Sequence, residues 1–98
     1  MNVKQHAKAM SVLKTLSPND LVQIEAIDHY DVEGRTTVPE AIKDTSENPA
    51  TITTNGYYQK HDDNFIWISE EKATEGKENQ IRVRLTRYVI RVVRLKEA

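Results

Sequence analysis

The feature that most constrains this chain is the alternation of apolar and polar residues in short segments. Residues 21–27 follow this pattern, and residues 80–85 follow it without exception. Successive side chains of a β-strand point to opposite faces, so a repeat of two is typical of a strand with one buried face. Further strands, rich in β-branched or aromatic residues, are predicted at 50–60, 65–69 and 89–95.

The chain before the first strand has a different period. Residues 1–16 place apolar side chains three and four positions apart, which is typical of one face of an α-helix. This row consists of Val3, Ala7, Met10, Leu13 and Leu16. Pro18 ends the helix, because the residue before a proline disfavours helical dihedral angles. Residues 28–49 show neither period and contain Gly34 and Pro39, so we expect a long loop there.

Together these elements predict a mainly β fold behind an N-terminal helix. Five short, sequential, antiparallel strands favour a small barrel, because closure removes exposed strand edges. We expect one domain over residues 1–98, with the barrel at 21–95 and a tight turn at 86–88 before the last strand. The expected core consists of Val22, Ile24, Ile52, Phe65 or Ile66, Trp67 or Ile68, Val83 and Val92.

Several motifs resemble those of small phage and prophage proteins with an SH3-like barrel. The run from Leu16 to Asp28 is similar to their GD-V-V-W-D opening, and residues 53–58 are similar to a T-GW second strand. Residues 66–68 look like their hydrophobic third strand, and residues 81–95 like their final strand, 3₁₀ turn and strand. The resemblance implies a five-stranded antiparallel SH3-like barrel and a phage or mobile-element setting, with no activity attached.

The chain departs from this family at three places. Asn19 replaces the usual glycine, Ala26 replaces the strand tryptophan, and Leu85-Thr86 replaces Ile-Pro before the last turn. SH3-like barrels bind peptides, bind RNA as Sm-like rings and serve as phage assembly parts, so fold alone does not assign a function.

Composition argues against several classes of function. The chain has no cysteine and only three glycines, which excludes disulfides and thiol nucleophiles and disfavours phosphate-binding loops. We therefore expect no enzyme, cofactor or metal. Histidine and aspartate gather at 28–31 and 61–63, where turn chemistry explains them better than metal binding. No stretch resembles a signal peptide or a membrane span, so we expect a cytoplasmic protein, in the host cytoplasm if viral, with no membrane partner.

Charge is distributed unevenly along the chain. Residues 21–80 hold thirteen acidic and five basic residues, whereas residues 81–98 hold six basic residues and one acidic residue. The candidate binding residues are five arginines near the C-terminus and two tyrosines: Arg82, Arg84, Arg87, Arg91, Arg94, Tyr57 and Tyr58. Alternation at 80–85 predicts that Ile81, Val83 and Leu85 face the core and that both arginines between them face outward.

Two functions fit these features. The first is a non-catalytic interaction module that acts through contacts with an unknown protein. The second is a small RNA- or DNA-binding barrel of Sm-like type, in which the arginines hold the phosphate backbone. In the first case the arginines pair with acidic residues of the same chain, such as Glu25, Asp62, Asp63 and Glu70. Homo-oligomer formation is left open.

Overall fold

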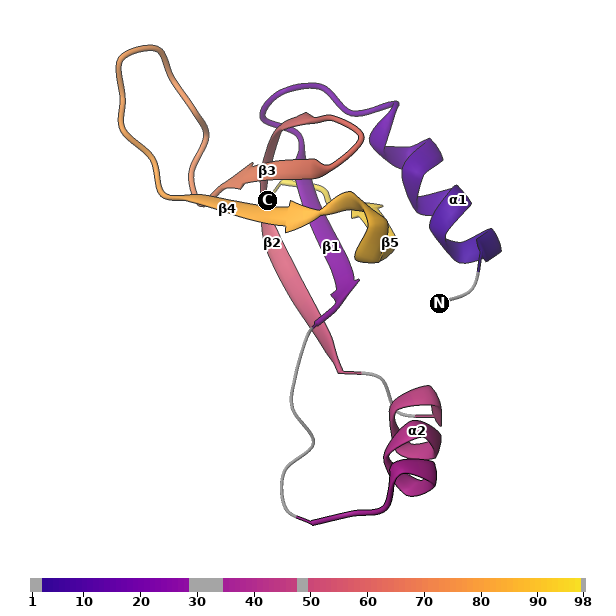
Figure 1. The fold of residues 1–98 in the computed structure, drawn as a ribbon. Helices are drawn as coiled ribbons and strands as arrows, with labels where there is room; N and C mark the ends of the chain where they lie inside the picture. The colour runs from indigo at the N-terminus through magenta and orange to yellow at the C-terminus, as the bar shows by residue number, and fades with distance from the viewer. Residues whose placement is uncertain (1–2, 29–34, 48–49, 98) are drawn as a thin grey trace.

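The computed structural model describes residues 3–28, 35–47 and 50–97. Its elements are α1 (Val3–Leu13), β1 (Leu21–Ile27), α2 (Val38–Glu47), β2 (Thr51–His61), β3 (Phe65–Ser69), β4 (Ile81–Leu85), the 3₁₀ helix η1 (Thr86–Tyr88) and β5 (Val89–Arg94). The strands form one antiparallel sheet in the order β4-β3-β2-β1-β5 (Figure 1). The prediction of a mainly β chain with five antiparallel strands and an N-terminal helix is confirmed.

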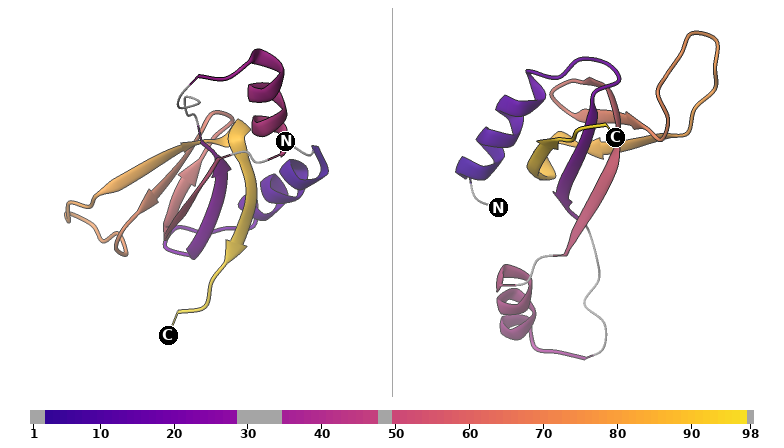
Figure 2. Two further views of the ribbon diagram at one scale, coloured as in Figure 1. Left: turned by 90° about the horizontal axis from the view of Figure 1, so that it is seen from below. Right: turned by 180° about the vertical axis from the view of Figure 1, so that it is seen from behind.

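The sheet is open in the part of the chain that the structure describes. Strands β4 and β5 are its two edges, and the strands fan out between them (Figure 2). The expected closure into a barrel is therefore not seen. Helix α1 lies along β5 and covers that end of the sheet, whereas α2 stands apart from it (Figure 1).

Strand β2 connects the two halves of the sheet. Its residues 51–57 pair with β1, and its residues 57–61 pair with β3. Gly56 lies beside this change of partner. A Cβ atom on Gly56 would lie 2.5 Å from Ile68 Cγ2 and 2.7 Å from the Ser69 carbonyl oxygen. The strand approaches β3 so closely here that only glycine fits.

The core lies between α1 and the inward face of the sheet. Its fully or nearly buried members are Ala9, Leu13, Val22, Ile24, Ala26, Tyr58, Ile66, Ile68, Val89 and Val92. Of the expected core, Val22, Ile24 and Val92 are confirmed, and Ile66 and Ile68 are the buried members of their pairs. Ile52 packs against the core but is only partly buried. Val83 was wrongly assigned to the core, since it is 43% exposed.

The orientation predicted for β4 is reversed in the structure. Arg82 pairs with Ile68 and Arg84 pairs with Ile66, and cross-strand partners share a face of the sheet. The arginines therefore lie on the same face as the buried isoleucines, and Val83 lies on the opposite, solvent-exposed face. Alternation shows which residues share a face, but it does not show which face is covered.

The buried face of α1 also differs from the predicted row. Val3 and Ala7 are exposed, whereas Ala9 and Leu13 are buried. His6 occupies the first position of the buried row, and its Nδ1 donates a hydrogen bond to the Val89 carbonyl oxygen at 2.8 Å. This bond connects the sheet-facing side of α1 to the start of β5.

Helix α2 lies within residues 28–49, where the sequence analysis placed a loop. Thr37 caps it, because its hydroxyl accepts the Glu40 amide at 3.3 Å and its carbonyl accepts the Ala41 amide at 3.0 Å. The spacing Thr-x-x-Glu is a capping-box pattern. Pro39 is tolerated because amides of the first turn have no partner inside the helix. The long-loop prediction is therefore wrong for residues 38–47.

Packing of α1 on the sheet can be tested with two substitutions in the same helix. We expect Leu13→Ala to lower the free energy of unfolding by about 2–5 kcal/mol, because it leaves a cavity in the core. Val3→Ala is the matched control: Val3 is 82% exposed, so we expect a change within about 0.5 kcal/mol. Urea denaturation measures both, and equal effects would contradict the burial of this helix face.

Candidate interaction surface

The outer face of β3 and β4 carries a continuous row of apolar side chains. Phe65 pairs with Leu85 and Trp67 with Val83, and Ile81 follows on the same face. We call these five residues the apolar strip. Ile81 is 45% exposed and Val83 43%, and the Phe65 and Trp67 rings lie 5.8 Å apart between centroids. Large apolar residues gathered on a solvent-facing sheet surface are typical of a binding site.

The turn before β3 holds the end of the strip in place. Asp62 accepts hydrogen bonds from the amides of Asn64 at 2.8 Å and Phe65 at 2.7 Å, and these bonds lower the pKa of its carboxyl group. The Thr86 hydroxyl donates to the Asp63 carbonyl oxygen at 2.6 Å. The start of β3 and the end of β4 are thus fixed to each other.

Three of the five candidate arginines bond to acidic or hydroxyl groups of their own chain. Arg82 forms an ion pair with Glu70 at 3.0 Å, which the sequence analysis named as one of four acidic partners. The Arg84 Nε donates to the Thr54 hydroxyl at 3.0 Å. Arg94 lies 3.5 Å from the Asp20 carboxylate and donates to the Thr15 carbonyl oxygen at 2.9 Å.

The other two arginines lie elsewhere. Arg87 stacks over the Tyr88 ring at 4.9 Å from its centroid. Arg91 of β5 lies opposite Glu25 of β1 in the strand ladder, on the face of the sheet opposite to Arg82 and Arg84. Within the described residues the five arginines therefore do not form one continuous basic face.

The two candidate tyrosines point to opposite faces of β2. Tyr58 is buried, and its hydroxyl lies 2.6 Å from the His61 Nδ1. Burial raises the pKa of Tyr58, and the His61 backbone acts in the opposite direction. Tyr57 lies on the outer face and is partly exposed. Only Tyr57 is therefore placed to take part in binding.

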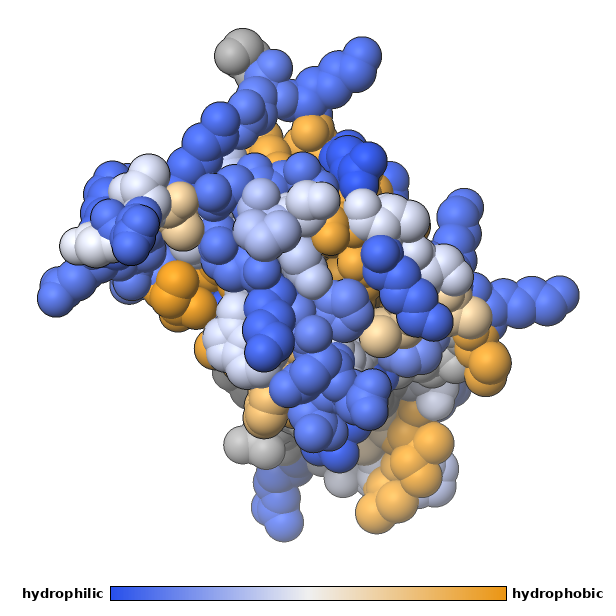
Figure 3. Space-filling view, turned by 90° about the horizontal axis from the view of Figure 1, so that it is seen from above, coloured by the Kyte–Doolittle hydropathy of each residue, from blue (hydrophilic) through white to orange (hydrophobic). Residues whose placement is uncertain are grey.

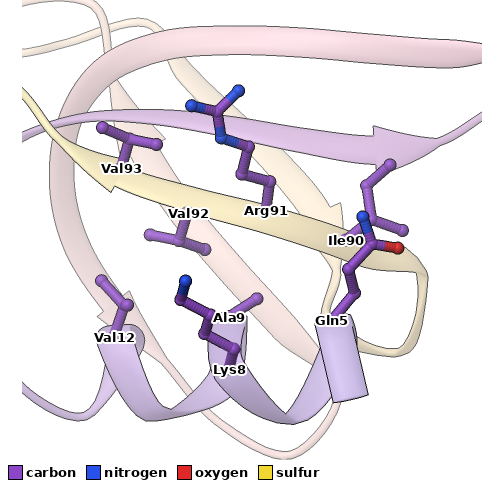
Figure 4. A pocket seen from close by; sticks show the side chains of 8 residues that line it. All are labelled: Gln5, Lys8, Ala9, Val12, Ile90, Arg91, Val92 and Val93. Carbon is purple, nitrogen blue, oxygen red and sulfur yellow. The ribbon is translucent and has the colours of Figure 1, made fainter. Parts of the chain in front are cut away.

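A groove of about 370 Å³ runs between α1 and β5 (Figure 4). Val92 points from β5 toward the helix, where Ala9 and Val12 lie, whereas Arg91 points to the other side of the strand. The side chains by which α1 packs on β5 form the floor of this groove. The groove brings together no group of catalytic side chains. Figure 3 shows another part of the surface, on which hydrophilic residues predominate and apolar residues appear as separate patches.

No group of three or more histidine, aspartate or glutamate side chains capable of holding a metal ion occurs within residues 3–28, 35–47 and 50–97. His29 and Asp31, considered above as ligands, lie outside the described residues. His61 is hydrogen-bonded to Tyr58, and Asp62 stabilises its own turn. Neither described helix has the length and apolar character needed to cross a membrane.

Comparison of the chain with protein-family models, curated proteins and solved structures finds no match. The interpretation of the surface therefore depends on its own geometry.

Nucleic-acid binding can be tested by changing Arg82 and Arg84 together to glutamine. Because the five arginines do not form one continuous basic face, we expect wild-type protein to show no appreciable binding to RNA or DNA at about 50 mM salt, where electrostatic binding is strongest. We expect the variant to lose only about 1 kcal/mol of stability. Filter binding with single- and double-stranded RNA and DNA measures the affinity of the wild type and the variant for nucleic acid. If the wild type at micromolar concentration formed a salt-sensitive complex and the variant did not, the expectation of no nucleic-acid binding would be contradicted.

Proposed function

We propose that this chain is a non-catalytic interaction module with an SH3-like barrel fold, which acts by binding another protein through the apolar strip. The phage or mobile-element setting implied by the sequence resemblance is part of this proposal. The observation that carries it is the strip itself: Phe65, Trp67, Ile81, Val83 and Leu85 lie side by side on one face and remain partly exposed.

The topology supports the fold assignment. The five strands lie in the order β4-β3-β2-β1-β5 with a 3₁₀ helix between β4 and β5, and the resembling proteins also end in a strand, a 3₁₀ turn and a strand. Asn19, which replaces the glycine of the resembling proteins, has a φ of 71°. Asparagine tolerates this left-handed conformation better than most residues, so the replacement is compatible with the same backbone.

The free energy of association that aromatic side chains supply favours the strip over other described surfaces as a protein-binding site. Large aromatic side chains commonly supply most of the free energy of association when they are buried in a partner. Phe65 and Trp67 supply two such side chains, and three aliphatic neighbours extend the apolar surface around them. The RNA- or DNA-binding alternative has less support, because Arg91 lies on the face of the sheet opposite to Arg82 and Arg84, so the five arginines do not form one basic face.

Selection from a displayed peptide library tests this proposal. We expect the purified protein to enrich ligands whose affinity falls at least about tenfold when Phe65 and Trp67 are both changed to serine, since hot-spot aromatics typically contribute more than about 1 kcal/mol each. Isothermal titration calorimetry with the selected ligands measures the affinities.

The matched control changes Ser11 and Lys14 to alanine. Ser11 lies in α1 and Lys14 directly follows it, both are outside the strip, and both are exposed. We expect this variant to bind the selected ligands as the wild type does. The proposed function would be contradicted if no ligand were selected. It would also be contradicted if the selected ligands lost as much affinity for the control variant as for the Phe65 and Trp67 variant.

A further inference from the structure

A groove separates β4 from the first half of β2. Two cavities lie along it, one of about 340 Å³ and one of about 190 Å³. Both cavities have walls from both strands: Ile52, Thr53, Thr54 and Asn55 from β2, and Arg82, Val83, Arg84 and Leu85 from β4. The hydrogen bond from Arg84 to Thr54 crosses between the strands. We call this hollow the β2–β4 groove.

Strand β4 borders this groove with backbone amides that do not bond to β3, whereas the Val83 carbonyl oxygen accepts a hydrogen bond from Arg84 Nη1 at 3.0 Å. The Glu70 amide donates to the Gln80 carbonyl, and the Thr86 amide donates to the Asn64 carbonyl. In an antiparallel ladder hydrogen-bonded pairs alternate with pairs that are not bonded. The amides of Arg82 and Arg84 therefore face β3, and those of Ile81 and Val83 point away from it.

Strand β2 presents a second free edge on the opposite wall. The Asp28 amide donates to the Ala50 carbonyl, and the Tyr58 amide donates to the Asp20 carbonyl. By the same alternation, the backbone groups of Thr53 and Asn55 point away from β1. No described strand pairs with either edge at these positions. The groove is therefore lined by two strands whose backbone groups at these positions are not paired by any described strand.

The side chains of β4 define what such a strand must carry. On the inward face, Arg82 and Arg84 present two guanidinium groups, which pair well with carboxylates. On the outward face, Ile81 and Val83, which belong to the apolar strip, present apolar surface. A complementary strand therefore alternates acidic residues with apolar residues.

A second copy of β4 does not satisfy these requirements. Antiparallel pairing of two β4 strands with their apolar rows on one face places arginines opposite arginines. Like charges directly opposite each other destabilise a sheet. Charge complementarity therefore favours a different, acidic segment over self-pairing.

We propose that the β2–β4 groove binds an extended segment of a partner protein in which acidic and apolar residues alternate, and that this segment pairs with β4 as an added strand. Its carboxylates bind Arg82 and Arg84, and its apolar side chains extend the row of Ile81 and Val83. Addition of a strand to an exposed sheet edge is an established mode of peptide recognition. The inference rests on the proposed function and specifies the partner's chemistry.

The Arg82–Glu70 ion pair is no obstacle to this mode of binding. Both side chains are about half exposed, and exposed pairs contribute only about 0–1 kcal/mol, so a ligand carboxylate can replace Glu70. We therefore expect Glu70→Gln to strengthen binding of an acidic strand.

Fluorescence anisotropy with labelled model peptides tests the inference. The probe is a peptide of about seven residues in which valine alternates with glutamate, long enough to span β4. A lysine–valine peptide is its matched control. We expect the glutamate peptide to bind at least about tenfold more tightly, since a hydrogen bond to a charged group contributes about 1.5–3 kcal/mol. Changing Arg82 and Arg84 together to glutamate should reverse this preference.

Backbone pairing is tested separately with Val83→Pro, which removes an amide that faces the groove and takes no part in the ladder with β3. We expect this variant to lose binding of the glutamate peptide, while Val83→Ile, which keeps the amide, retains it. Circular dichroism checks that each variant is folded. If Val83→Pro is not folded, a glutamate peptide methylated on its backbone amides tests the same contact, and we expect it not to bind.

The inference is overturned if the glutamate peptide does not bind, if the lysine peptide binds as well, or if removal of the edge amides has no effect. These outcomes can be told apart from failure of the proposed function. Displayed ligands that depend on Phe65 and Trp67 would still support a protein-binding module. If no such ligands were selected, both the proposed function and the inference about the β2–β4 groove would be contradicted.

Discussion

The close contact between Gly56 and strand β3 is the constraint on which the rest of the sheet depends. β2 is the only described strand that pairs with both β1 and β3, and Gly56 lies where it changes from one to the other. Ile68 and the Ser69 backbone occupy the space in which a side chain at this position would lie. The absence of a side chain lets β3, and β4 beyond it, reach the position at which Ile66 and Ile68 enter the core.

That arrangement determines both surfaces considered above. Once Ile66 and Ile68 face inward, the alternating residues of β3 must face outward, and these are Phe65 and Trp67. Pairing with β4 then directs its arginines to the inner side. The apolar strip and the β2–β4 groove are therefore two consequences of one register, and both lie beside the same edge strand.

Local sequence patterns predicted the strands well and their environment poorly. The bounds of β1 and β3 and the turn at 86–88 were predicted correctly, because alternation and turn residues are local signals. The orientation of β4 was not predicted correctly, because the face of β4 that is covered depends on Ile66 and Ile68 in a neighbouring strand. Only the coarse class of the fold could be read from the chain, because closure depends on how distant edges meet.

Two signals were present in the sequence but were not used. Thr37-Val38-Pro39-Glu40 is a helix-start pattern, and attention to the capping residues would have predicted α2. Phe65-Ile66-Trp67-Ile68 is apolar on both faces of a strand, so one face had to be either covered or available for binding. The clustering of arginines in residues 82–94 is a weaker signal, because acidic and hydroxyl partners elsewhere in the chain bond to three of them.

Substitution of Gly56 by alanine tests the central claim most directly. The added methyl group would meet Ile68 and the Ser69 carbonyl oxygen, and a backbone atom cannot move without disturbing the pairing of β2 with β3. Urea denaturation should show a loss of about 1–3 kcal/mol in the free energy of unfolding. Asn55→Ala, at the neighbouring exposed position, should change it by less than about 0.5 kcal/mol. Unchanged stability of the Gly56 variant would contradict the account.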